Sequence, residues 1–152
     1  MVDIDRTSAW DLARLLRDRE LGAVEVMTHC LAAIDRSNTS INAIVTLDAE
    51  KAMAMAREAD NASPAGRLRH GLPRAVKDCF DIGGMRGTSG SRVHENRVAD
   101  ADTLHVARLR RAGAIPFAKA NTPEFTMGGQ TTNEVFGLTR NPFDTSKTTT
   151  GS

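Results

Sequence analysis

The chain has 152 residues, the size of one ordinary domain, with 40% apolar and 26% charged residues, as in soluble globular proteins. A net charge of +1 without a clustered basic patch argues against direct binding of nucleic acid, and no apolar run could span a membrane. The two cysteines, Cys30 and Cys79, form no CxxC pattern, and no secretory signal follows Met1. We therefore expect reduced thiols and a cytoplasmic protein.

The first 66 residues favour helices. Ser8 and Asp11 have capping-box spacing ahead of a leucine repeat, which predicts a first helix. Gly22 interrupts, and a second helical stripe follows at residues 27–34. A β-prone run over 43–47 comes next, and Asp48 is placed to cap a third helix with an alanine-rich face. Residues 61–70 are rich in Asn, Ser, Pro and Gly and are expected to form a loop.

The remaining residues, 67–152, alternate between strand and helix patterns. Residues 73–77 predict a short strand, and 81–91 an irregular glycine-rich segment. Asp102 is expected to cap a helix that runs to Ala112, with Gly113 as its stop. Residues 114–118 predict a second strand, which Pro116 places at a sheet edge or delays. From residue 121 we expect a long ordered loop with one short helix near 123–125. The pattern as a whole indicates an α/β fold, with helices packed on a mixed sheet.

Lys77 ends the first strand of this second region, in Val76-Lys77-Asp78. A lysine with a pKa of about 10.4 is almost fully protonated at pH 7, so a lysine that acts as a base needs apolar surroundings or cationic neighbours. Val76 is an apolar neighbour. Asp78 would oppose the neutral amine, unless strand alternation turns its side chain to the other face of the sheet. In isolation, a lysine at a strand end is more often a surface charge.

Other catalytic patterns are weak. The four histidines show no metal-ligand spacing, there is no GxSxG elbow, and no glycine-rich segment matches a phosphate loop. We expect no metal and no cofactor.

Four ordered stretches resemble the amidase signature family. They are Leu72–Asp78, Asn121–Phe125, Phe136–Asp144 and Thr150-Gly151-Ser152, which is similar to the start of the family's Gly/Ser-rich loop. The resemblance covers the whole chain but only the front part of a family member. It implies that residues 1–152 are the N-terminal portion of one amidase domain, with a helical part at 1–66 and a lysine-motif α/β part at 67–152, cut at the Gly/Ser-rich loop.

The resemblance also implies roles for individual residues. The family hydrolyses amides with a Ser–cis-Ser–Lys triad, in which Lys77 would be the general acid/base and Ser152 the middle serine that relays a proton. The nucleophilic serine and the oxyanion-hole amides would lie in a segment that follows residue 152. Thr126, Met127, Gly128, Gly129 and Gln130 would line the substrate cavity. The implied reaction is hydrolysis of a small-molecule carboxamide to a carboxylate and ammonia or an amine, through an acyl-serine.

The sequence leaves other roles open. The chain could belong to the amidase subunit of a tRNA-dependent amidotransferase, with partner subunits, or form a homodimer. Thr149 and Thr150 stand where the family commonly has Pro-Gly, and a β-branched residue resists left-handed backbone angles. That departure favours a non-catalytic binding or structural module, and a truncated copy without a role of its own is a further alternative.

Overall fold

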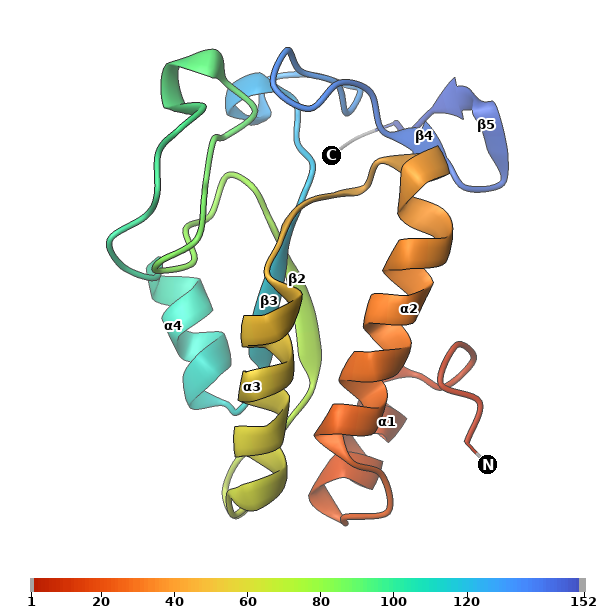
Figure 1. Cartoon of the computed structure of the whole chain (residues 1–152), viewed down its shortest axis with the longest axis vertical. Coiled ribbons are helices and arrows are strands. Elements are labelled where there is room, and N and C mark those ends of the chain that lie inside the picture. The colour runs from red at the N-terminus through yellow and green to blue at the C-terminus, as the bar shows by residue number, and fades with distance from the viewer. Residues whose placement is uncertain (1, 151–152) are drawn as a thin grey trace.

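The structure is a computed structural model that describes residues 2–150. It has four α-helices and two short 3₁₀ turns around a three-stranded sheet and a small hairpin within these residues (Figure 1). In chain order the elements are α1 (Ala9–Arg17), α2 (Ala23–Ile41), β1 (Ile44–Leu47), α3 (Ala49–Asn61), β2 (Pro73–Lys77), η1 (Arg92–His94), α4 (Leu104–Arg111), β3 (Ile115–Ala120), η2 (Glu124–Thr126), β4 (Arg140–Asn141) and β5 (Asp144–Thr148).

Side-chain caps define the starts of the first three helices. The Ser8 hydroxyl accepts a hydrogen bond from the Asp11 amide, and the Asp48 carboxylate accepts one from the Lys51 amide, as the sequence predicts. The α2 N-cap is Gly22, which has no side chain to offer. Instead, Asp60 near the end of α3 accepts hydrogen bonds from the first two amides of α2, at 2.6 and 3.1 Å. This contact ties α2 to α3.

The sheet has the order β1-β3-β2, with β3 parallel to β2 and antiparallel to β1. Pro116 therefore lies in the central strand, which already begins at Ile115, so neither an edge position nor a start after the proline is correct. The proline is accommodated because β1 pairs only with residues 118–120 of β3, and the β2–β3 register shifts between Arg74 and Ala75, opposite Pro116. Pro116 is thus on a central strand at a point where only one neighbour pairs with it.

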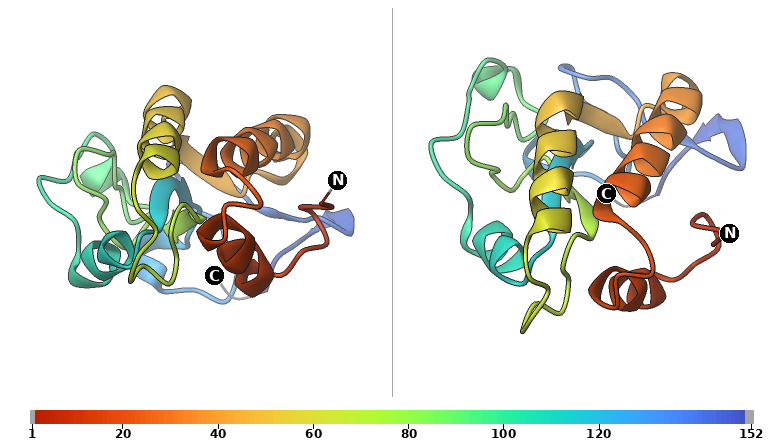
Figure 2. Two further views of the ribbon diagram at one scale, coloured as in Figure 1. Left: turned by 90° about the horizontal axis from the view of Figure 1, so that it is seen from below. Right: turned by 60° about the horizontal axis from the view of Figure 1, so that its bottom comes forward.

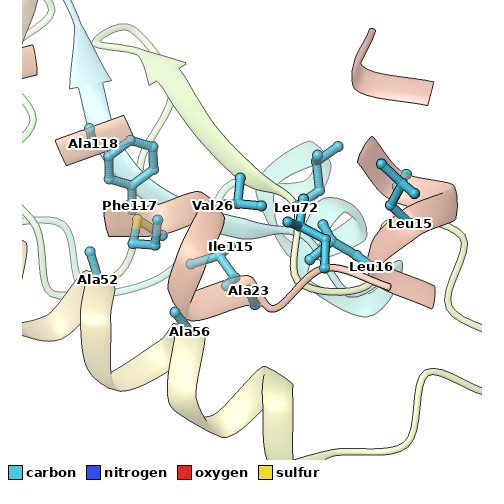
Figure 3. Packing of buried hydrophobic residues seen from close by; sticks show 13 residues of the cluster. Leu15, Leu16, Ala23, Val26, Ala52, Ala56, Leu72, Ile115, Phe117 and Ala118 are labelled. Atoms are coloured by element: carbon cyan, nitrogen blue, oxygen red, sulfur yellow. The ribbon is translucent and has the colours of Figure 1, made fainter. Parts of the chain in front are cut away.

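Helices lie on both faces of this sheet. Helices α2 and α3 lie side by side over one face, while α4, the crossover between β2 and β3, lies on the other (Figure 2). The main core packs α1, α2 and α3 against β3 and against Leu72, which directly precedes β2 (Figure 3). Its centre includes Met27, Ala52, Ala56 and Phe117, which are nearly or fully excluded from solvent. A smaller cluster joins Val76 of β2 to Val106 of α4. The expected mixed α/β fold, with helices packed on a mixed sheet, is confirmed.

Two local predictions in the second half need correction. The N-cap of α4 is Thr103 rather than Asp102, because the Asp102 carboxylate accepts from the Gly83 amide and pairs with Arg110. Residues 140–148 form the β4–β5 hairpin, where the sequence predicts part of a long loop. Its β5 strand, DTSKT, carries no apolar alternation that would reveal a strand.

Across the residues that the structure describes, no helix combines the length and apolarity that a membrane span needs.

Candidate active site

Lys77 is the last residue of β2, where the carboxyl ends of the two parallel strands meet the loops at the top of Figure 1. Its register partner on β3 is Ala120, whereas Val76 pairs with Lys119. Paired residues of neighbouring strands share a face, and successive residues alternate. Lys77 and Ala120 therefore lie on one face of the sheet, and Val76 and Lys119 lie on the other. Lys77 itself is half-buried.

A hollow of about 400 Å³ lies beside Ala120 at this end of the sheet. Its wall combines residues from five separate parts of the chain, none of them charged. They are Ala43, Ala120, Asn121, Thr131, Thr139, Thr149 and Thr150. The hollow therefore brings the residues directly before the Gly/Ser-rich loop next to the register partner of Lys77. The hydroxyl of Thr149 is buried there and has no hydrogen-bond partner among residues 2–150.

Thr149 and Thr150 have ordinary backbone angles, since neither is among the described residues with positive φ. Thr150 forms an antiparallel bridge with Gln130. The departure from Pro-Gly is thus accommodated without left-handed backbone at either threonine. Ser152 lies outside the described residues, as does the peptide bond before it.

The segment expected to line the substrate cavity, residues 126–130, is exposed. Thr126 and Phe125 have consecutive left-handed φ values of 64° and 49°, and the Met127 side chain is 79% exposed. Gly128 packs on Pro123, since a Cβ there would lie 3.1 Å from the Pro123 ring. Through its bridge to Thr150, Gln130 joins this segment to the wall of the hollow. The assignment of these residues to substrate binding stays a prediction.

An amide network holds the 121–139 loop in shape. The Asn133 side-chain amide donates to Asn121 Oδ1 and to the Thr122 carbonyl, both at 2.7 Å. Asn133 Oδ1 accepts from the amides of residues 135 and 136, and Asn121 Nδ2 donates to Thr139 Oγ1 at 2.9 Å. Because these polar groups satisfy one another inside the loop, a long segment without regular structure keeps one conformation.

A buried ion pair beside Lys77 was not predicted from the sequence. The side chains of Asp78 and Lys119 are both 0% exposed, and Lys119 Nζ lies 3.2 Å from Asp78 Oδ1. Lys119 Nζ also donates to the Phe80 carbonyl at 2.7 Å, while Asp78 Oδ2 accepts from the Thr88 amide and hydroxyl at 3.0 and 2.6 Å. The available signal was a lysine inside the apolar strand run PFAKA, which requires a buried partner.

No group of three or more potential metal ligands occurs between residues 2 and 150.

Comparison with known proteins places the chain in a family. Residues 25–152 match the model of the Amidase family. The chain belongs to this family. Among curated relatives, it is 42% identical over 138 residues to a glutamyl-tRNA(Gln) amidotransferase subunit of Nitratidesulfovibrio vulgaris, which covers 90% of this chain and 28% of the relative. It is 38% identical over 155 residues to the same subunit of Mycobacteroides abscessus, over 100% of this chain and 32% of the relative.

Solved structures give the same assignment. A 6-aminohexanoate cyclic dimer hydrolase in complex with substrate superposes with a TM-score of 0.86 at 31% identity, over 99% of this chain and 30% of that one. The corresponding glutamyl-tRNA(Gln) amidotransferase subunit from Thermotoga maritima gives a TM-score of 0.77 at 26% identity, over 97% of this chain and 30% of that one. The chain thus has the fold of the corresponding part of amidase enzymes, and it spans about 30% of the length of these relatives.

Proposed function

We propose that this chain is the N-terminal portion of a single amidase domain and supplies the lysine side of an amide-hydrolysing site. The observation that carries the proposal is the position of Lys77, whose register partner Ala120 lines a hollow together with Thr149 and Thr150. Ser152 follows two residues later in the chain. A Ser–Ser–Lys proton path needs a lysine and a serine, and the sequence supplies Lys77 beside Ala120 and Ser152 directly after the threonines of this wall.

The chemistry assigns a task to each group. Hydrolysis of an amide requires a strong nucleophile, donors for the developing oxyanion and an acid for the departing amine. The neutral Lys77 amine takes a proton from the Ser152 hydroxyl while Ser152 takes one from the nucleophilic serine. The same path returns the proton to the leaving nitrogen as the C–N bond breaks and the acyl-serine forms, and water then hydrolyses the acyl-serine. In this proposal the nucleophilic serine lies in a segment that follows residue 152.

The wall of the hollow supports a neutral carboxamide as substrate, because none of the residues between 2 and 150 that line it carries a charge to hold an ionic group. Residues 126–130 are the proposed substrate-binding segment, and Gln130 contacts the wall through Thr150. We place this reaction in the cytoplasm, since Cys30 and Cys79 are both free thiols.

A chimera tests the proposal. Residues 1–152 replace the matching part of the Nitratidesulfovibrio vulgaris relative, and ammonia release from simple amides and from glutamine is measured. Lys77→Met is expected to lower kcat by about 10²–10⁴-fold, the range for loss of a general acid–base group. Lys147→Met is the matched control, because Lys147 is an exposed lysine whose side chain is 71% accessible. Equal activity of the two variants would contradict the proposal and favour a non-catalytic module.

A second proposal concerns partners. The names of the curated relatives support a role as part of an amidotransferase component that releases ammonia from glutamine for a partner subunit. Copurification of the complete gene product with a second subunit, together with glutaminase activity, is the expected result. Hydrolysis of other amides by a protein that purifies without a partner would contradict this second proposal and leave the first intact.

A further inference from the structure

The buried pair of Asp78 and Lys119 is energetically expensive. Removing two charges from water costs several kcal/mol for each ion, and apolar residues of the same volume often serve stability equally well. Both side chains here are fully excluded from solvent, and they lie beside an apolar cluster that contains Val76. A contribution to stability is therefore a weak explanation for this pair. Its position next to Lys77 suggests a role at the candidate site.

The pair changes the electrostatic surroundings of Lys77. Asp78 follows Lys77 directly, and a carboxylate at that distance favours the charged form of a lysine. Lys119, whose register partner is Val76, approaches Asp78 from the face of the sheet opposite Lys77. The negative charge of Asp78 is thus matched by Lys119.

A second ion pair lies next to the first, and its charges are balanced in the same way. Around Gly87, a Cβ would lie 3.1 Å from Asp81 Oδ1, 3.2 Å from Lys119 Nζ and 3.3 Å from Arg97 Nη1. Arg97 pairs with Asp81, as Lys119 does with Asp78. This cluster therefore contains two acids and two bases, and its charges sum to zero. The described residues that line the hollow beside Ala120 contribute no charged side chain.

Asp78 also begins a chain of hydrogen bonds between two loops. Asp78 holds Thr88 through two hydrogen bonds, and the Thr88 hydroxyl accepts from the Gly90 amide at 3.0 Å. Next to them, Ser89 accepts from the Phe125 amide at 2.8 Å through its carbonyl. The Ser91 hydroxyl completes the connection by donating to Glu124 at 2.7 Å. Asp78 thereby connects the end of β2 to the turn that precedes residues 126–130.

We propose that Asp78 and Lys119 are positioning residues for Lys77. Lys119 neutralises the charge of Asp78, so that Lys77 can work as an uncharged amine. The inference rests on the proposed function of Lys77. Neither residue touches the reacting atoms. Removal of Lys119 alone leaves the Asp78 carboxylate, which still accepts two hydrogen bonds from Thr88, without its counter-ion next to Lys77.

Competitive acetylation of the 152-residue chain with a trace of acetic anhydride at pH 9 tests this inference, since only an uncharged amine reacts. The chain has four lysines, and the rate at Lys77 is read by mass spectrometry relative to exposed Lys147. Lys119→Met is expected to lower this ratio about tenfold, the effect of one unmatched nearby charge. Asp78→Asn is expected to raise it, and the double variant to restore it.

Asp102→Asn is the control, because it removes the charge of a different acid–base pair, the partly buried pair of Asp102 and Arg110. A loosened fold exposes Lys77 and raises its rate, so a fall in Lys119→Met has the opposite sign to a structural effect. An unchanged or raised ratio in folded Lys119→Met overturns the inference. If circular dichroism shows that Lys119→Met does not fold, the acetylation ratio of Asp78→Asn tests the inference instead. A ratio above that of Asp102→Asn supports the inference, and any smaller change overturns it.

The two proposals fail separately. Acetylation reports the charge of the Lys77 amine and does not depend on hydrolysis. An active Lys77→Met chimera together with the expected acetylation ratios would reject the proposed function alone. An inactive Lys77→Met chimera, together with acetylation ratios that do not change when Asp78 or Lys119 is substituted, would reject only the positioning role.

Discussion

Gly90 offers a sharp test of how the loops around the hollow are packed. Its φ is +68°, a left-handed angle that costs any other residue about 1–2 kcal/mol. A Cβ at Gly90 would also lie 2.9 Å from the Thr122 carbonyl oxygen and 3.2 Å from Asn133 Nδ2. Both atoms belong to the amide network, so neither can move without disturbing it. Overpacking of this kind typically adds about 1–3 kcal/mol.

Gly90→Ala is therefore expected to destabilise the chain by about 2–5 kcal/mol in total. Gly66→Ala and Gly137→Ala are matched controls, because both glycines have positive φ, at 72° and 80°, and a Cβ at either meets nothing within 4 Å. Each control should cost only the backbone term, about 1–2 kcal/mol. Urea unfolding followed by far-ultraviolet circular dichroism measures all three. If Gly90→Ala costs no more than the controls, the described contact between the two loops is wrong.

Helix capping, histidine burial and the missing nucleophile give three further predictions. Asp60→Ala should destabilise the chain by about 1–2 kcal/mol in urea unfolding, and by more than Asp48→Ala does. The reason is that Asp60 caps two amides of α2, whereas Asp48 caps only one amide of α3. Equal losses of stability in the two variants would contradict the cross-helix cap. Burial lowers the pKa of His70, so the unfolded chain binds a proton first as the pH falls. Stability should be complete above about pH 6.5 and decline below it, less so in His70→Asn, and a pH-independent midpoint between about pH 7 and 5 would refute this. The 152-residue chain alone should hydrolyse no simple amide, because the proposed nucleophile lies beyond residue 152; turnover that disappears in Lys77→Met would contradict this.

The sequence predicted the local elements well where side chains act on their own neighbours. Ser8 and Asp48 cap the helices assigned to them, and β2 begins and ends at the expected residues. These features depend on contacts within a few positions of the chain, which periodicity and cap chemistry describe directly.

The misses depend on contacts between distant segments. Pro116 suggested an edge strand, but its strand is central because β1 pairs only beyond the proline. Asp102 has the chemistry of an N-cap, yet Gly83 and Arg110 take its carboxylate. Lys119 lies beyond the predicted strand end, and its partner Asp78 is 41 positions earlier in the chain. Propensity does not encode such pairings.

The central claim is that one proton path runs through both Lys77 and Ser152. A double-variant cycle in the chimera, with Lys77→Met, Ser152→Ala and both together, tests it most directly. Residues that act as a unit lose their effect together, so the double variant should have nearly the same kcat as the slower single variant. Losses that multiply, or full activity in either single variant, would show that the two residues do not share a path.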